Sequence, residues 1–338
     1  MKKILTYIPG LVLTVLIAFF ARSIESILPI SIIGDSVLAL FIGIVIKQFM
    51  KPNQLLEPGL KFTAKRLLRL SLILLGSSLS ISTVLNVGGL SLIVMFFTFL
   101  ASFGGGYLIG KWLGLDWKLS SMINAGTSIC GGSAIAALVP VIKAKEKDIA
   151  YAISVTFLFD VAMIILFPIM GRALGLTDIA YGMWTGTAVN DTSSVVAAGY
   201  AFSEVAGDFA TMVKLTRTLA IIPTVLIFSL ISARIDAKAN RDATTSKNKV
   251  KITGLIPWFI VAFVALSLIN SFGLISLSVS VAMKNISRFF MVTALAAIGL
   301  QTDLKEVKKL GPNPMIHSVI VSTLMAIVAL VVIYFIKI

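Results

Sequence analysis

The chain has 338 residues, of which 58% are hydrophobic and only 13% are charged, and its mean hydropathy is +1.01. A soluble core of this size cannot bury that much apolar surface, so these values exclude a soluble globular domain. They predict an all-α protein that crosses a membrane several times. The formal net charge of +14 does not indicate nucleic-acid binding, because the basic residues lie in short loops beside apolar runs, where they orient helices in a bilayer.

Apolar runs divide the chain into predicted membrane segments, because a bilayer core of about 30 Å needs about 20 helical residues. The first run is interpreted as a retained helix and not as a signal peptide, since Ala21-Arg22-Ser23 is a poor cleavage site and more spans follow. The eleven predicted segments are 4–22, 28–46, 67–86, 89–111, 118–142, 149–172, 176–201, 209–233, 253–272, 284–302 and 313–336.

The basic loops predict the orientation of these segments. With the N-terminus inside and all segments crossing, the basic loops 47–66, 234–251 and 303–309 are cytoplasmic, and the acidic turn 203–208 is outside. The polar 234–251 stretch is expected to be a flexible cytoplasmic linker. The loop with Lys143, Lys145 and Lys147 falls outside and disagrees with the rule, so a re-entrant hairpin at 118–142 stays open as an alternative to a full span.

The first polar interruption is Asn124–Ser133, a run of small and hydroxyl residues inside an apolar segment. Each glycine weakens a helix by about 1 kcal/mol relative to alanine, so the run predicts a broken helix near the midplane, whose second half begins at Gly132 or Ser133. The free N–H groups at the start of this second half favour the binding of an anion. The predicted ligands are Thr127, Ser128, Gly131, Gly132 and Ser133. The alternative is close helix packing by small residues, which also suits Gly104–Gly106.

The second polar interruption, Thr185–Ser194, contains an acid in the middle of an apolar segment. An ionised residue at the bilayer centre costs about 3 kcal/mol, so Asp191 is either paired or functional. Asn190 and Asp191 are candidates for binding a proton or a sodium ion, and the hydroxyl groups that follow are candidates for substrate contacts. The predicted substrate-binding residues of this run are Asn190, Thr192, Ser193 and Ser194.

Three further charged residues lie in apolar segments. Arg217 presents a planar fork of donors that suits an oxyanion and is a predicted substrate ligand, whereas Lys214 is expected to snorkel toward the outer interface. Both are also candidate partners of Asp191. Asp160 is a second predicted ion-coupling residue, as a partner of Arg217 or as a proton relay.

Catalytic residues, metal ligands and cofactors are not predicted. The single cysteine, Cys130, has no base in its neighbourhood of the sequence, because the only histidine, His317, lies near the start of the last segment. Cys130 is therefore interpreted as a packing residue. The chain also lacks a phosphate-binding loop of the GxxxxGK[ST] type, so it does not hydrolyse a nucleotide by that means.

Eleven segments with an internal N-terminus divide into one leading helix and two groups of five that start from opposite sides of the membrane. This count predicts two inverted repeats, about 28–172 and 176–336, within one transmembrane domain formed by residues 1–338. The fourth segment of the first group is the glycine-rich one, and that of the second group ends in Gly299, Gln301 and Asp303. A chance match in segment count is the competing explanation.

The runs NAGTSICGGSAIAA (124–137) and GTAVNDTSSVVAA (186–198) resemble the YeiH-type family of bacterial membrane proteins, whose assigned activity is sulfate export. The similarity covers essentially the whole chain. That family is similar to cation/proton antiporters and bile-acid symporters, which implies inverted repeats with crossed broken helices, and a panel and a core domain that move relative to each other. It also implies a second crossover at Gly299–Asp303, although the single glycine there departs from the pattern.

The expected function is a secondary transporter in the bacterial cytoplasmic membrane that moves a small inorganic or organic anion, outward by the resemblance, and couples it to a proton or sodium ion through Asp191 and Asp160. Sulfate, a related sulfur oxyanion or a sulfonate is the expected substrate. A sodium or other cation/proton antiporter is the alternative. The lipid bilayer is the expected partner, and whether the chain forms a homodimer stays open.

Overall fold

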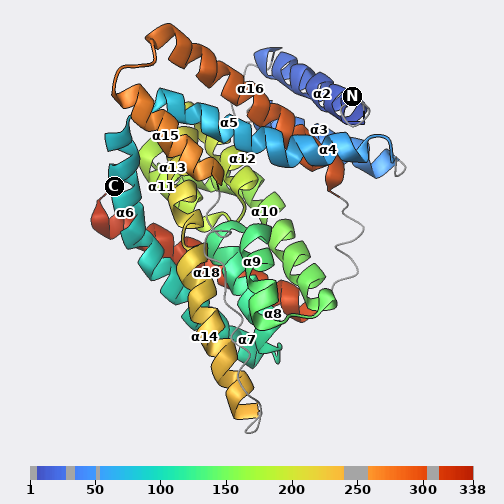
Figure 1. The fold of residues 1–338 in the computed structure, drawn as a ribbon, viewed down its shortest axis with the longest axis vertical. Helices are drawn as coiled ribbons and strands as arrows, with labels where there is room; N and C mark the ends of the chain where they lie inside the picture. Colours follow the sequence, from blue (N-terminus) through green and yellow to red (C-terminus); the bar gives the residue numbers. More distant parts are fainter. Residues whose placement is uncertain (1–5, 28–34, 51–53, 240–257, 303–311, 338) are drawn as a thin grey trace.

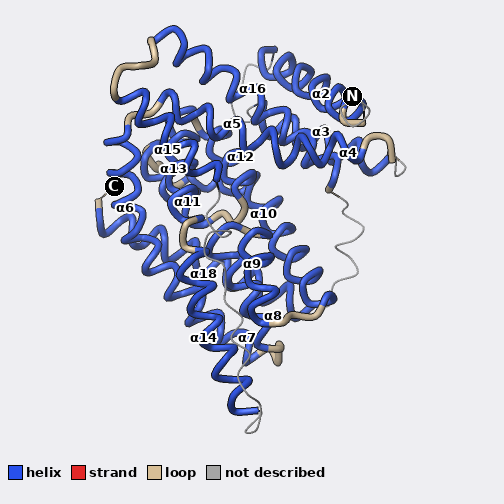
Figure 2. Tube along the Cα trace, in the orientation of Figure 1, coloured by secondary structure: helices blue, strands red, loops and turns tan. Residues whose placement is uncertain are grey.

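The computed structural model describes residues 6–27, 35–50, 54–239, 258–302 and 312–337 (Figure 1). Within these ranges the regular structure is helical and contains no strand (Figure 2). The predictions for the 303–309 loop, including Asp303, and for most of the 234–251 linker lie outside the described residues.

Six helical runs are long and apolar enough to cross a membrane: Ile8–Glu25, Ile81–Trp112, Lys147–Ala173, Glu204–Ile235, Leu277–Gln301 and Pro312–Ile336. Gly132–Ile142 and Trp258–Ser271 are shorter apolar helices. In chain order the elements are α2 (Ile8–Ile27), α3 (Asp35–Phe49), α4 (Glu57–Phe62), η1 (Thr63–Leu67), α5 (Leu68–Leu75), η2 (Gly76–Ser78), α6 (Ile81–Phe99), η3 (Leu100–Gly105), α7 (Gly106–Trp112), α8 (Trp117–Ala125), η4 (Gly126–Cys130), α9 (Gly132–Ile142), α10 (Glu146–Ala173), α11 (Asp178–Ala188), α12 (Thr192–Phe202), α13 (Glu204–Thr218), α14 (Ile221–Ala239), α15 (Trp258–Ser271), α16 (Leu277–Gln301) and α18 (Pro312–Ile336).

The predicted boundary between segments 67–86 and 89–111 is wrong by several residues. The chain turns at Leu79 and Ser80, where the Ser80 hydroxyl accepts a hydrogen bond from the Thr83 N–H and caps α6. Apolar residues continue across this turn, so hydropathy alone gives no signal for it.

One group of helices, which we call the α16 group, consists of α2 to α5, α15 and α16 and lies in the upper part of Figure 1. Ile17, Leu60 and Val292 pack together in its interior. At Gly299 a side chain would approach the Leu40 carbonyl oxygen of α3 to 2.1 Å, so this glycine allows two helices to pack closely. The helix α16 is continuous through Gly299 to Gln301, so the described part of the predicted 299–303 crossover is helical, and Asp303 lies outside the described residues.

In the first polar interruption the chain reverses its direction. The break predicted in Gly126–Ser133 is present, between η4 and α9. Lys118 Nζ donates to the Lys143 carbonyl oxygen at 3.0 Å, so the two ends of the 118–142 segment lie together. The segment is a hairpin and not a continuous span. The first arm has nine residues in α8 and five in η4, and the second arm has eleven in α9; they rise about 20 and 16 Å, less than a bilayer core of about 30 Å.

The helices on both sides of the second polar interruption, α11 and α12, also form a hairpin (178–202), where a single span over 176–201 was predicted. The Ser203 hydroxyl donates to Asp178 Oδ1 at 2.6 Å, and the Tyr181 hydroxyl donates to the Ala198 carbonyl oxygen at 2.9 Å. Helix α10 connects the base of the first hairpin to the base of the second, so the hairpins approach from opposite ends (Figure 1).

The hairpins occupy unequal places in the two predicted groups of five. The first hairpin is the fourth segment of its group, and the second hairpin is the first segment of its group. The hairpins thus have different places in the two groups, and the division into two inverted repeats, 28–172 and 176–336, stays a prediction.

Helix α18 contacts both hairpins. His317 Nε2 lies 3.0 Å from Asn124 Oδ1 in the first hairpin. In the second hairpin, the Trp184 indole N–H donates to the Ala326 carbonyl oxygen at 2.8 Å.

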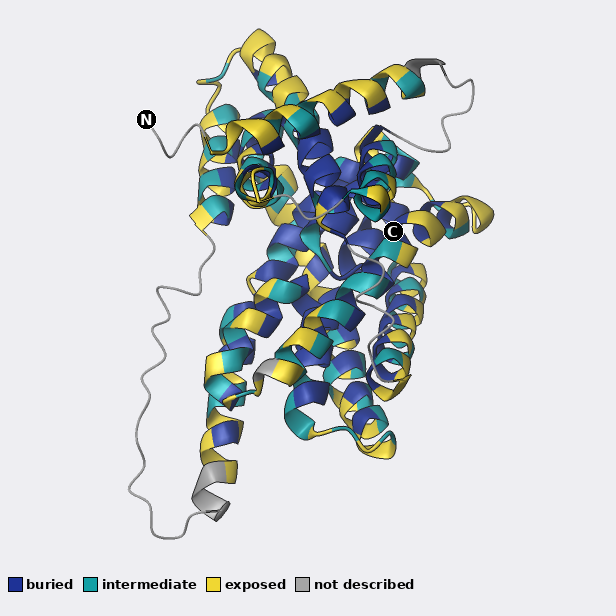
Figure 3. Cartoon of the chain, turned by 90° about the vertical axis from the view of Figure 1, so that its right-hand side faces the viewer, coloured by how far each residue is buried: buried dark blue, intermediate teal, exposed yellow. Residues whose placement is uncertain are grey.

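We call the second group of helices the hairpin group. It consists of the two hairpins and of α6, α7, α10, α13, α14 and α18. Buried residues concentrate where the hairpins meet, and the outer helix faces are exposed (Figure 3).

Candidate functional site

The tips of the two hairpins meet in the interior, and we call this place the tip junction; it comprises 126–133 and 189–194. A Cβ atom built on Gly131 would lie 3.1 Å from Asp191 Oδ1, so the tips are in contact. Gly131 has φ +64° and ψ −132°, a backbone conformation that only glycine adopts without strain. The double glycine thus makes the reversal and the contact possible.

Arg217 of α13 fastens the two tips together. Its guanidinium is fully buried and donates to four carbonyl oxygens: Nη2 to Thr127 at 2.6 Å, Nε to Ser128, and Nη1 to Val189 at 3.1 Å and Gly186 at 3.4 Å. These carbonyls end the first half-helix of each hairpin, where the helix dipole favours a cation. The fork predicted to bind an oxyanion is occupied by the backbone.

Lys214 lies one turn before Arg217 and is also fully buried. Its Nζ donates to the carbonyl oxygens of Ile129 at 2.7 Å, Val189 at 3.1 Å and Asn190. The prediction that Lys214 snorkels to the interface is wrong, because three carbonyl oxygens replace its hydration. In the described part of the chain neither cation lies within 4.0 Å of a carboxylate.

The two acids are bound by the start of α12. Asp160 of α10 is buried and accepts hydrogen bonds from the backbone N–H groups of Asn190 at 2.9 Å and Asp191 at 3.1 Å. Asp191 caps α12 by accepting from the Ser193 N–H at 2.9 Å and from the Ser193 hydroxyl. Asp160 is therefore held by backbone and not by Arg217, while Asp191 stays half-exposed.

Some of the predicted hydroxyl ligands are buried in the structure, and others are accessible. Thr127 and Ser128 are buried and donate to carbonyl oxygens of their own helix, at 2.7 and 2.5 Å. Ser193 and Ser194 are also buried, whereas Ser133 and Thr192 keep accessible surface. The hydroxyls that face accessible space thus belong to the first turns of α9 and α12.

The N-terminus of α9 is open. No side chain caps it, and a Cβ atom built on Gly132 would meet nothing within 4 Å. The first turn of an uncapped helix carries free N–H groups and the positive end of the dipole. The half-exposed Asp191 carboxylate lies beside this turn, at Gly131.

Two further buried polar side chains, Asn190 and His317, lie in the hairpin group. The side-chain amide of Asn190 is wholly buried, and neither its oxygen nor its nitrogen has a partner among the described residues. His317 lies within hydrogen-bond distance of Asn124 and of the Ser120 hydroxyl, at 3.3 Å for the latter. Gly106 and Gly110 have no side chains, and this leaves space for Asn124 and Ser120. The close packing that the sequence indicated for the glycine run is thus, at Gly106, packing against α8.

Cys130 packs in the apolar cluster that surrounds the first tip. It is buried with Met95, Ala134 and Ile221 and forms no disulfide. Its surroundings are those of a packing residue.

Gly131→Ala is expected to lower the stability of the protein by about 1–3 kcal/mol, because alanine is strained at a positive φ. The measurement is the thermal melting temperature of the purified protein in detergent. Gly89→Ala is the control, since a Cβ atom there meets nothing within 4 Å inside α6. Equal melting temperatures of the two variants would contradict the assigned role of Gly131.

Comparisons with known proteins show that the chain is similar to membrane proteins. A family model described as Conserved hypothetical protein 698 matches residues 9–318. The chain is 50% identical over 332 residues to a UPF0324 membrane protein of Clostridium tetani, covering 96% of both chains. Similar proteins are the UPF0324 membrane proteins of Streptococcus pyogenes serotype M18, 40% identical over 92% of both chains, and of Streptococcus mutans serotype c, 39% identical over 89% of both.

The helices and these matches define a multi-pass helical membrane protein. The chain belongs to the UPF0324 family of membrane proteins.

Proposed function

We propose that the protein is a secondary transporter that moves a small anion across the cytoplasmic membrane by alternating access, and that it is not an enzyme. The observation that carries the proposal is the tip junction, where two opposed hairpins meet beside the uncapped N-terminus of α9. Secondary transporters use broken helices in this way, with half-helix N-termini directed at anionic substrate groups near the midplane.

The anion site is proposed at the first turns of α9 and α12. Free N–H groups of Gly132 and Ser133 and the hydroxyls of Ser133 and Thr192 donate to the oxygens of the anion. The Asp191 carboxylate lies within this space and repels an anion unless it carries a proton. Proton binding at Asp191 therefore favours anion binding, which supplies the coupling.

The hairpins also support a membrane orientation. When both hairpins return to the side from which they enter, Lys118, Lys143, Lys145 and Lys147 lie on the cytoplasmic side together with the 47–66 loop. The other assignments are unchanged, because two reversals preserve the direction of every later helix. The loop that disagreed with the positive-inside rule then obeys it, and 203–208 stays outside.

Sulfate, or a related sulfur oxyanion or sulfonate, is the proposed substrate, and export the proposed direction, on the basis of the resemblance to YeiH-type proteins. The test is uptake of radiolabelled sulfate into inside-out proteoliposomes with and without a proton gradient directed into the vesicles, because a proton that binds together with the anion drives the anion in its own direction. We expect uptake that the gradient accelerates at least about tenfold, a factor that corresponds to about 1.4 kcal/mol. Protein-free liposomes are the control.

A sodium or other cation/proton antiporter is the second candidate. The half-exposed carboxylate of Asp191 and the unpartnered amide of Asn190 favour it, since both offer oxygen ligands to a cation. If the same vesicles show sodium-dependent proton movement and no sulfate flux, the anion proposal is wrong and the cation/proton antiporter takes its place.

A further inference from the structure

A ladder of charged side chains joins the two groups of helices at the base of the second hairpin. Lys284 and Arg288 lie one turn apart on α16, and Glu204 and Asp208 lie one turn apart on α13. Lys284 Nζ is 2.9 Å from Glu204 Oε1 and 2.9 Å from Asp208 Oδ2, and Arg288 Nη1 is 3.2 Å from Glu204 Oε2. We call these four residues the ladder.

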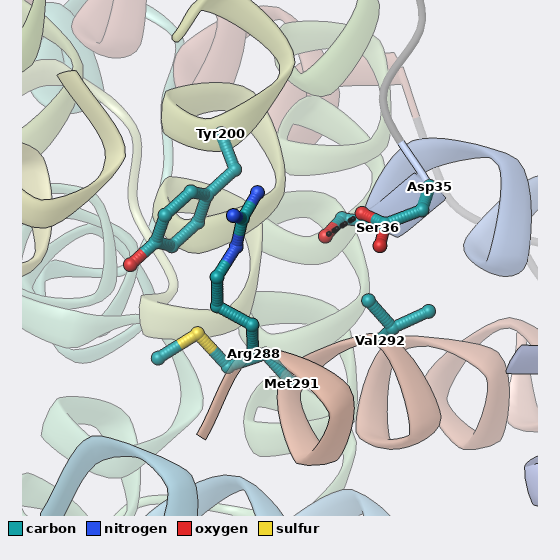
Figure 4. Close-up of a pocket in the computed structure, with 6 residues that line it drawn as sticks. All are labelled: Asp35, Ser36, Tyr200, Arg288, Met291 and Val292. Carbon is teal, nitrogen blue, oxygen red and sulfur yellow. Dashed lines mark hydrogen bonds between the residues drawn. The ribbon is translucent and has the colours of Figure 1, made fainter. Parts of the chain in front are cut away.

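Tyr200 of α12 connects the ladder to the second hairpin. Its hydroxyl donates to Asp208 Oδ1 at 2.5 Å, and the guanidinium of Arg288 lies 5.6 Å from the centre of its ring. Figure 4 shows Tyr200 beside Arg288, with Asp35 and Ser36 of α3 facing them across a narrow cleft. The cleft is lined by Asp35, Ser36, Tyr200, Arg288, Met291 and Val292.

The cleft lies at one end of a seam between α12 and the helices α3 and α16, which pack against it. The opposite end of α12 is the tip junction. From Tyr200 to Thr192 the helix rises by about 12 Å, which is the distance along α12 between the ladder and the proposed anion site. In the described residues all ion pairs that join the two groups belong to the ladder.

The ladder differs from the buried cations of the tip junction in how easily it can open. The Lys284 and Glu204 side chains are 27% and 47% exposed, and ion pairs at such exposure are weak individually. Lys214 and Arg217 are fully buried and cannot leave their carbonyl partners without a large loss. A relative movement of the two groups therefore breaks the ladder and keeps the tips together.

We propose that the ladder is the gate that closes the seam on the side of Glu204, and that its opening admits solvent and solute along α12 to Asp191 and Thr192. The inference rests on the proposed transport function for its purpose. That Lys284 and Arg288 hold the seam closed does not depend on which ion the protein carries.

The experiment measures how fast a cysteine at the tip reacts with a membrane-impermeant maleimide added on the side of Glu204. The background is Cys130→Ala with Thr192→Cys in membrane vesicles. Lys284→Met combined with Arg288→Met is expected to raise the labelling rate at least about fivefold. Lys284→Arg combined with Arg288→Lys keeps both charges and is expected to restore slow labelling.

Lys61→Met is the matched control, because it removes the exposed pair of Lys61 with Glu57 on α4, away from the seam, and is expected to leave labelling unchanged. If the double Met variant does not fold, as judged by its melting temperature, Lys284→Met alone is measured. Equal labelling rates in the Met, charge-conserving and control variants overturn the gate. Faster labelling of the Met variant, together with no sulfate flux through the unaltered protein, supports the gate and overturns the anion assignment.

Discussion

Replacing Arg217 with leucine is expected to separate the two hairpin tips and to give the largest loss of stability among single substitutions at the tip junction. The substitution removes a donor from four buried carbonyl oxygens, of which that of Val189 keeps Lys214 Nζ at 3.1 Å. Each buried carbonyl oxygen that loses its hydrogen-bond donor costs about 1–3 kcal/mol. We expect a lower melting temperature in detergent, and transport below detection in proteoliposomes.

Arg172→Leu is the matched control for this prediction. Arg172 also donates to carbonyl oxygens at the end of a half-helix, those of Ala201 and Phe202 at 3.1 and 3.2 Å, but at the partly exposed base of the second hairpin. Its loss is expected to cost only about 1 kcal/mol. If Arg217→Leu were no more destabilising than Arg172→Leu, the clamp assigned to Arg217 would not exist.

The positions of both breaks were predictable from the sequence, whereas the reversal of the chain was not. Gly131, Gly132 and Asp191 stand out within apolar runs because they lower helix stability or cost energy in a bilayer. Hydropathy measures the length of an apolar run and not the direction of the chain within it. Only the misplaced charge of the 143–147 loop indicated a hairpin at 118–142.

Gly299 shows how a similar residue pattern can lie in a continuous helix, α16. Small residues followed by polar ones suggested a second break there, yet the helix is continuous because the glycine accommodates the backbone of α3. A glycine in a membrane helix permits either unwinding or close packing. The two outcomes depend on a neighbour that lies far away in the sequence.

The buried charges of the tip junction follow a common rule that the sequence did not reveal. Two cations and two acids lie there, and pairing between them was the natural expectation. Instead Lys214 and Arg217 bind carbonyl oxygens at the ends of half-helices, while Asp160 and Asp191 bind N–H groups at the start of α12. Each charge thus faces the end of a helix dipole of opposite sign. The N-terminus of α9 differs from these helix ends, because no side chain caps it.

Replacing Asp191 with asparagine is expected to uncouple transport from the proton gradient without unfolding the protein. Asparagine is as good an N-cap as aspartate, so α12 keeps its cap and the melting temperature stays within a few degrees. The variant cannot bind and release a proton at this place, and it presents a permanently neutral group to the anion. Gradient-driven sulfate uptake is expected to fall at least about tenfold, a factor of about 1.4 kcal/mol, while exchange of sulfate across the membrane without a gradient persists.

Asp116→Asn provides the control for this change. Asp116 caps α8 by accepting from the Lys118 N–H at 2.8 Å, which is the same role in a helix cap at an exposed position far from the tips. Its substitution is expected to leave gradient-driven uptake unchanged. If Asp191→Asn kept the full gradient dependence, the proton would have to bind elsewhere. Asp160 would then be the remaining acid at the tip junction, and its bonds to the N–H groups of Asn190 and Asp191 would transmit its charge to the same helix start.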